Sequence, residues 1–171
     1  SAPLGVWNVP GNHDDPYWTR RVMRRFGLNL LAGDLADVGP VQIIGIDDMI
    51  LGTDQIRGLM VAAARADPAR PLIALAHEPD YARLLPPRVG LFLAGHTHGG
   101  QIRIAGYPRL LPQYERWRHG LYRIGPGQQM VVSAGIGTTF VPMRIGVPPE
   151  IVVVDLQPAR QAPGRNSGTE R

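Results

Sequence analysis

Three short apolar runs of this chain each lead directly into a loop that carries histidine. Residues 6–9 precede Asn12-His13-Asp14, residues 72–76 precede His77, and residues 91–94 precede Gly95-His96-Thr97-His98. In open α/β sheets, ligand-binding loops gather outside the carboxyl ends of the strands. We therefore expect these three loops, far apart in sequence, to meet at one edge of a sheet.

Strands and helices are expected to alternate up to about residue 95. We expect strands at 4–9, 41–46, 71–76 and 89–94, helices at 16–26 and 53–66, and a helical turn at 80–85. Asp15 is a plausible N-cap and Pro16 fits the first helical position. Beyond Gly100, short β segments are expected at 101–104, 121–124, 129–134 and 151–156. This pattern predicts an α/β fold in which helices flank a two-sheet sandwich.

The histidines are the residues most suited to chemistry. A single loop histidine is usually a surface residue, but four of the five histidines fall in these loops, and only His119 does not. His96 and His98 stand two residues apart beside glycines, which allow a backbone to fold closely around a ligand. Imidazole suits Zn, Fe or Mn. The combination therefore indicates a metal site.

In this order, Pro10-Gly-Asn-His-Asp14, Ala76-His77 and Gly95-His-Thr-His98 resemble the calcineurin-like metallophosphoesterases. The resemblance runs from about residue 4 to residue 156. Ser133–Gly137 and Pro142–Ile151 further resemble a membrane-associated bacterial, phosphodiesterase-like subgroup of that family. This implies a metallophosphoesterase fold and hydrolysis of a phosphoester, with a phosphodiester or phospholipid-like substrate.

The resemblance also implies roles for individual residues. Asn12, His77 and His96 would bind one of two divalent metal ions (Mn, Fe or Zn), and His98 would bind the other. His13 would face the scissile phosphate and help the leaving oxygen to depart, and Asp14 would orient and polarise His13. Two metal ions can together activate water and stabilise charge on the phosphoryl group.

Two motifs of that family are expected upstream of Gly-Asn-His and are not found there. They are an Asp-x-His strand end and a Gly-Asp-x-x-Asp motif. Gly33-Asp34-Leu-Ala-Asp37 spells the second, but it follows Gly-Asn-His and falls where a turn is expected, so we interpret it as a coincidence. The chain also starts with serine, almost at a predicted strand. We therefore expect residues 1–156 to be the C-terminal portion of an N-terminally truncated metallophosphoesterase domain, and 157–171 a disordered tail.

Other polar residues allow two interpretations. We expect Asp47 and Asp48 to cap the following loop rather than to approach the site, and Glu78 to be a solvated loop acid. A group of arginines and aromatic residues could bind a phosphate or lipid head group, although a solvated loop is the simpler interpretation. The group comprises Arg103, Arg109, Arg116, Arg118, Tyr107, Tyr114 and Trp117.

Composition limits the remaining functions. The net charge of +4 fits an anionic partner, but the arginines are scattered and no nucleic-acid-binding motif is present, so nucleic acid is not expected. Cysteine is absent, which excludes thiolate ligands.

We see no signal peptide and no apolar run of the ~20 residues that a membrane span needs, so we expect a location in the cytoplasm or peripheral to a membrane. If the chain were complete, it could instead be a degenerate, non-catalytic domain that binds a metal or a partner. Oligomeric state is left open.

Overall fold

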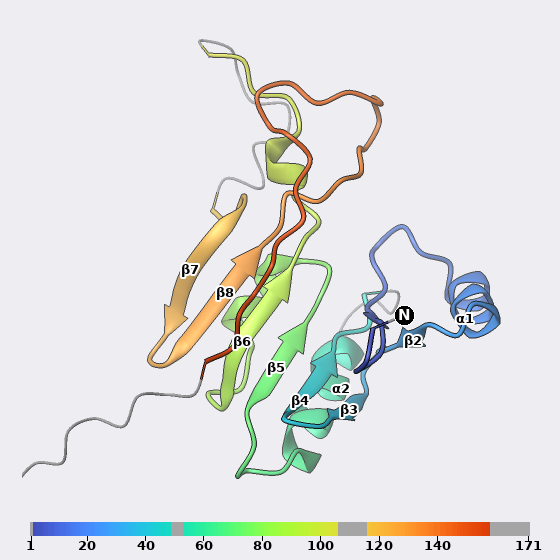
Figure 1. Ribbon diagram of the computed structural model, residues 1–171, viewed down its shortest axis with the longest axis vertical. Coiled ribbons are helices and arrows are strands. Elements are labelled where there is room, and N and C mark those ends of the chain that lie inside the picture. The colour runs from blue at the N-terminus through green and yellow to red at the C-terminus, as the bar shows by residue number, and fades with distance from the viewer. Residues whose placement is uncertain (1, 49–52, 106–115, 158–171) are drawn as a thin grey trace, which may run out of the picture.

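The computed structural model describes residues 2–48, 53–105 and 116–157. Its main element is a six-stranded sheet in the order β3-β4-β5-β6-β8-β7 (Figure 1). The strands are β3 (Leu35–Val38), β4 (Val41–Gly45), β5 (Leu72–Leu75), β6 (Val89–Ala94), β7 (Gly120–Gly125) and β8 (Gln128–Val132). The four central strands are mutually parallel, and β3 and β7 pair antiparallel at the two edges.

Helices complete the α/β architecture that the sequence predicts. Helix α2 (Thr53–Arg65) lies between β4 and β5 in the chain, and the 3-10 helix η1 (Pro79–Arg83) lies between β5 and β6. A second 3-10 helix, η2 (His98–Gly100), follows β6. Because β4, β5, β6 and β8 run in the same direction, the loops after them leave from the same edge of the sheet.

The first strand belongs to a separate, smaller sheet. β1 (Trp7–Asn8) pairs in parallel with β2 (Asn29–Leu30), and α1 (Pro16–Arg25) connects them. The expectation that residues 4–9 end at the edge of the main sheet was therefore wrong. The predicted start of α1 is confirmed, because the Asp15 carboxylate accepts hydrogen bonds from the amides of Tyr17 and Trp18 at 2.9 and 2.8 Å.

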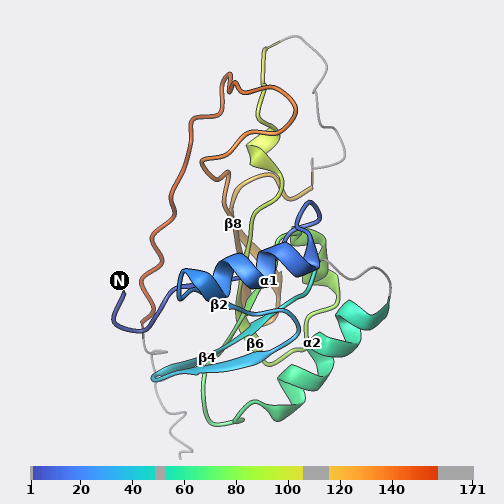
Figure 2. The same ribbon diagram turned by 90° about the vertical axis from the view of Figure 1, so that its right-hand side faces the viewer.

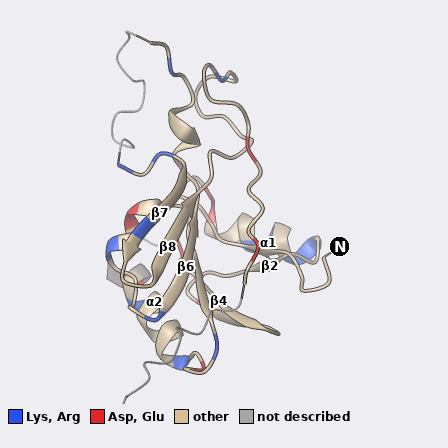
Figure 3. Ribbon diagram, turned by 60° about the vertical axis from the view of Figure 1, so that its left-hand side comes forward, with Lys and Arg blue, Asp and Glu red and all other residues tan. Residues whose placement is uncertain are grey.

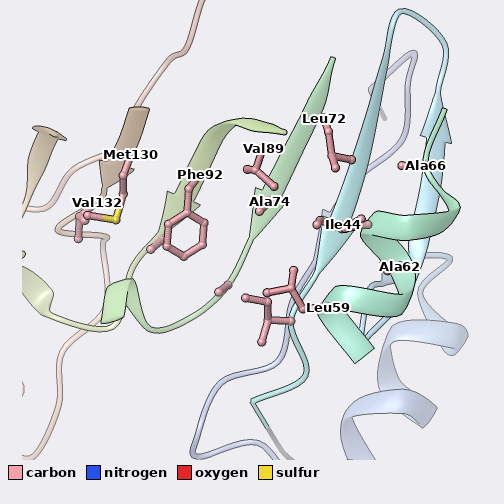
Figure 4. Close-up of a cluster of buried hydrophobic side chains, with 14 residues drawn as sticks. Ile44, Leu59, Ala62, Ala66, Leu72, Ala74, Val89, Phe92, Met130 and Val132 are labelled. Atoms are coloured by element: carbon pink, nitrogen blue, oxygen red, sulfur yellow. The ribbon is translucent and has the colours of Figure 1, made fainter. Parts of the chain in front are cut away.

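The core lies between the main sheet and α2, as Figure 4 shows. Leu59 of α2 is fully buried, and the other buried residues described on this helix are alanines, which let the helix approach the strands closely. From the strands, Ile44, Phe92 and Met130 are each 0% exposed. This packing holds the parallel strands, and so the loops at their ends, in fixed register.

The segment 147–157 lies on the face of the sheet opposite α2 (Figures 1 and 2). Between it and the strands is an apolar cleft of ≈ 1310 Å³, lined by Ile73, Leu91 and Val131 on one side and by Val152 and Val154 on the other. The predicted strand at 151–156 was wrong, because this segment forms no ladder with any described strand. The predicted strand at 101–104 is reduced to one bridge between Ile102 and Ile145.

The turn expected at residues 33–37 was also wrong. Leu35–Val38 form strand β3, which pairs with β4 through the tight connection at Gly39-Pro40. Gly39 has a φ of 73°, a left-handed conformation that glycine adopts without steric cost. A short strand with Ala, Asp and Gly around it carries little β signal, so tertiary pairing decided its structure.

Some predictions lie outside the described residues. These are the tail after residue 157 and the side chains of Tyr107, Arg109 and Tyr114. In the parts of the chain that are described, no helix has both the length and the apolar character needed to cross a membrane.

Candidate active site

The ends of β5 and β6 bring two of the predicted ligands into contact. The sheet's hydrogen bonding continues beyond both strands, because the Ala76 amide donates to Leu93 O at 3.1 Å and the Gly95 amide donates to His77 O at 3.0 Å. As a result, His77 Nε2 lies 2.8 Å from His96 Nδ1. The rings meet edge to face, with centroids 4.6 Å apart.

The surroundings of both imidazoles favour the neutral form. Burial lowers the pKa of His77, and burial together with the neighbouring His77, His98 and His13 lowers the pKa of His96 to about 4. A metal ion binds the lone pair of a neutral imidazole. The pair is therefore suited to ligation at neutral pH without losing a proton first.

The Gly-Asn-His-Asp turn packs against this pair, although it comes from the small sheet. A methyl group at Gly11 would lie 3.0 Å from Cγ and Cδ2 of His77, so the turn touches the ring. Asp14 closes the turn by accepting a hydrogen bond from the Gly11 amide at 2.7 Å. Its other oxygen accepts from Thr19 Oγ1 of α1 at 3.3 Å. The site is thus assembled from two sheets rather than from one sheet edge.

His13 and Asn12 are exposed on the same turn. The charge of His13 contributes to lowering the pKa of both His77 and His96, which places it near the pair. The two hydrogen bonds that Asp14 accepts come from Gly11 in the turn and from Thr19 in α1, not from His13. Its role in orienting His13 stays a prediction.

The loop after β6 has an unusual backbone. His96 and His98 have φ values of 67° and 51°, in the left-handed region that non-glycine residues seldom occupy. Thr97 is fully buried and its hydroxyl donates to Arg118 O. Gly99 allows the tight turn, since a methyl group there would lie 2.6 Å from Val147 Cγ1. His98 Nδ1 lies 3.2 Å from Gly137 O, in the loop after β8.

Asp47 and Asp48 follow β4 and are both buried. Asp47 pairs with Arg20 Nη2 of α1 at 3.3 Å, and Asp48 accepts a hydrogen bond from Tyr81 Oη at 2.6 Å. Among the charges near His77, that of Asp48 is the main one opposing the fall in the pKa of His77. Asp48 therefore approaches the site, which the sequence interpretation disfavoured. The loop that the two were expected to cap includes residues 49–52, outside the described residues.

Glu78 is the acid that the sequence interpretation underrated. Its Oε1 lies 3.7 Å from His96 Nε2, so it borders the histidine pair instead of being a simple solvated loop acid. Burial, followed by the charges of Asp48 and Asp80, raises the pKa of Glu78. Its position directly after His77 was the signal that could have identified it.

Within the part of the chain that the structure describes, the arginines do not gather into one site. They are spread over α1, β7 and several loops (Figure 3). Trp117 packs against the core and lies edge to face with Tyr122, at 5.0 Å between ring centroids, while Arg116 stacks on its ring. Trp117 is thus structural rather than part of a solvated loop.

The donor set fits a divalent ion only in part. Two neutral imidazoles, with His98 nearby, supply nitrogen donors of the kind that Mn, Fe or Zn accept. Within the described ranges, however, no three or more His, Cys, Asp or Glu side chains form a group that could hold a metal ion. Asp37 does not add a carboxylate to the histidine pair. It forms an ion pair with Arg70 beside the start of β4, away from the histidines. Asp34 is exposed.

Known proteins are similar in sequence to most of this chain. An "Uncharacterized metallophosphoesterase" of Aquifex aeolicus (strain VF5) is 32% identical over 164 residues, which cover 92% of this chain and 62% of that protein. "Uncharacterized metallophosphoesterase YkuE" of Bacillus subtilis (strain 168) is 33% identical over 171 residues, covering 92% and 58%. Over nine tenths of its length the chain is therefore similar to proteins named as metallophosphoesterases, which supports its assignment to that family. This confirms the resemblance carried by the histidine motifs.

The match to other metallophosphoesterases is partial in length. A Bos taurus "Transmembrane protein with metallophosphoesterase domain" is 30% identical over 182 residues, covering 91% of this chain and 39% of that protein. The chain thus spans less than two thirds of the length of each of these relatives. No model of a protein family matches it, and no solved structure does.

Proposed function

We propose that the protein hydrolyses a phosphodiester with the help of two divalent metal ions, and that its substrate is phospholipid-like. The observation that carries this is the meeting of His77, His96 and the Gly11–Asp14 turn. His77 Nε2 and His96 Nδ1 lie 2.8 Å apart there, and a turn that bears a further histidine packs against His77. Family membership supports phosphoester hydrolysis in general, and the finer assignment is ours.

In this proposal, Asn12, His77 and His96 hold one ion and His98 holds the other. When bound, the ions would activate a water molecule and neutralise charge on the phosphoryl oxygens. The low pKa of His96 favours its role, because no proton competes for its lone pair at neutral pH. Glu78, which borders His96, adds negative charge where cations would lie.

His13 would donate a proton to the leaving oxygen. It is exposed on the turn that touches His77, so a substrate can reach it from solvent. Histidine is the side chain best suited to moving a proton near neutral pH. Asp14 would hold His13 in place by closing the turn through the Gly11 amide.

An apolar surface beside His98 supports the phospholipid-like substrate and a peripheral association with membranes. Ile136, Phe140 and Met143 are 70%, 87% and 47% exposed. They belong to the same segment after β8 as Gly137, whose carbonyl contacts His98. Exposed apolar side chains next to a catalytic site fit the acyl chains of an amphiphile. Nucleic acid fits less well, since the arginines are dispersed over the fold (Figure 3).

Metal content and turnover test the assignment together. In the full-length protein we expect Mn²⁺-stimulated hydrolysis of a chromogenic phosphodiester. His13→Ala should slow turnover by about 10²–10⁴-fold with metal content unchanged, whereas His96→Ala should lose metal. Arg123→Ala is the control, because Arg123 is exposed on β7, and it should leave both values unchanged. Loss of metal from His13→Ala would show that His13 is a ligand instead.

A non-catalytic, metal- or partner-binding domain is the alternative. It is favoured by the lack of a three-residue metal group within the described ranges. Elemental analysis of the full-length protein separates the two hypotheses. Our proposal requires about two ions per active chain, lost in parallel with turnover on chelation. A saturated content of one ion or fewer, without turnover, would favour the alternative.

A further inference from the structure

The contact between His98 and Gly137 determines which nitrogen of His98 carries the proton. Gly137 O lies 3.2 Å from His98 Nδ1. A carbonyl oxygen can only accept a hydrogen bond, so Nδ1 must donate in this contact. In the neutral ring the lone pair is then on Nε2. His98 is thereby prepared to bind a metal ion through Nε2 alone.

One guanidinium holds that carbonyl in place. Arg144 donates to Gly137 O from Nε at 3.0 Å and from Nη2 at 2.5 Å. It also donates to Ala134 O at 2.7 Å and to His98 O at 3.2 Å. Arg144 therefore binds the loop after β8 and the loop after β6 at the same time. No carboxylate in the described ranges forms an ion pair with it, so its donors serve the backbone.

Both loops need such support. His98 has a φ of 51°, which is costly for a residue with a Cβ. Gly135 and Gly137, on the other loop, are residues with wide conformational freedom. Without a clamp, the Gly137 carbonyl could turn away and leave His98 Nδ1 without its acceptor. Arginine suits this task because its planar group presents several donors in a fixed geometry.

We propose that Arg144 is a positioning residue that fixes His98 in the Nδ1–H tautomer by holding the Gly137 carbonyl. This inference rests on the proposed function only in giving His98 a role as a ligand. The orienting partners of metal-binding histidines typically contribute about 10–100-fold in metal affinity. We therefore expect Arg144 to raise the metal affinity of the site by a factor of that size, although it contacts neither the metal nor the substrate.

Nitrogen-15 NMR of the histidine rings tests the proposal on the metal-free, full-length protein. The wild type should show His98 with a protonated Nδ1 and an unprotonated Nε2. Arg144→Met should show a mixture of the two tautomers and should weaken Mn²⁺ binding by about 10–100-fold. Arg123→Met is the matched control, because Arg123 is exposed on β7, and it should match the wild type. A His98 that stays fully Nδ1–H in Arg144→Met, with Mn²⁺ binding within twofold of the wild type, would overturn the proposal.

A second variant guards against misfolding. Arg144→Lys keeps the charge and most of the bulk but lacks the planar guanidinium group. We expect a smaller change in the His98 tautomer populations and in Mn²⁺ affinity than in Arg144→Met. If Arg144→Met does not fold, an unchanged tautomer and Mn²⁺ affinity in Arg144→Lys would count against the proposal. The tautomer is measured without metal or substrate. If the proposed hydrolysis were not found, the tautomer result would therefore still be valid. If the tautomer proposal failed, the hydrolysis would likewise be unaffected.

Discussion

Gly11 and His77 are in contact across the boundary between the small sheet and the main sheet. The Gly11 backbone lies against the imidazole ring, because a methyl group at this position would lie only 3.0 Å from Cγ of His77. Its φ is not in the left-handed region. The requirement for glycine at this position is therefore one of space, and it concerns a predicted ligand directly.

Gly11→Ala should displace the His77 ring or the turn. Overpacking of this kind costs about 1–3 kcal/mol, and we expect a fall of at least tenfold in kcat/KM and in Mn²⁺ affinity. Thermal unfolding and metal titration would measure the two effects. Gly90→Ala is the control, because no atom lies within 4 Å of the added methyl group and its φ is ordinary. If both variants behaved like the wild type, the contact with His77 would not matter to the site.

At the scale of the elements, α2 determines how firmly the parallel strands are held. Among the side chains of α2 that the structure describes, Leu59 is the large one with 0% exposure. Alanines 62 and 63 on the helix and Ala66 just beyond it are also buried (Figure 4). Small residues around one large residue let helix and sheet approach closely, and they concentrate the contact in Leu59. The loops of the site begin at the ends of these same strands.

Leu59→Ala should destabilise the fold by about 2–5 kcal/mol, since it leaves a cavity that alanine neighbours cannot fill. Chemical denaturation would give the change in the free energy of unfolding. Val61→Ala on the same helix is the control, as Val61 is 53% exposed, and it should change the free energy by less than about 1 kcal/mol. A similar loss in both variants would mean that α2 does not anchor the sheet.

The elements also show where local signals suffice. The start of α1 was predictable from Asp15 and Pro16, because a cap and a fixed φ act within a few residues. Strand β6 was predicted with its observed limits, Val89–Ala94. The predicted strands at 101–104 and 151–156 failed, since β-branched residues favour extension but a strand needs a neighbour with free hydrogen-bonding groups.

In the molecule as a whole, the loops that follow β6 and β8 lie together beyond the end of the sheet (Figure 1). The Arg103 amide donates to Ile145 O at 2.8 Å, and the Ile145 amide donates to Gln101 O at 3.0 Å. Gln101 is fully buried, and its side-chain amide donates to Thr139 O and Val141 O. These bonds join the two loops into one unit that carries Phe140 and His98.

Phe140→Ser should weaken association with lipid surfaces several-fold, because Phe140 is 87% exposed and apolar. Sedimentation with phosphatidylglycerol vesicles would measure it, and hydrolysis of a soluble chromogenic phosphodiester should be unchanged. Leu121→Ser, at an exposed position on β7, is the control and should bind vesicles like the wild type. Equal vesicle binding by Phe140→Ser and the wild type would contradict the hypothesis that this apolar surface contacts membranes.

The sequence by itself indicated the family and the α/β class, because motif residues, caps and apolar runs are local signals. It also supplied a ligand set that stays a prediction. Only the tertiary structure decided that the Gly-Asn-His-Asp turn reaches His77 from a second sheet. It also brought Glu78 beside His96 and Asp48 near His77, and it joined Arg144 to the His98 carbonyl. These are contacts between segments distant in sequence. They depend on how strands pair and helices pack, which no local pattern encodes.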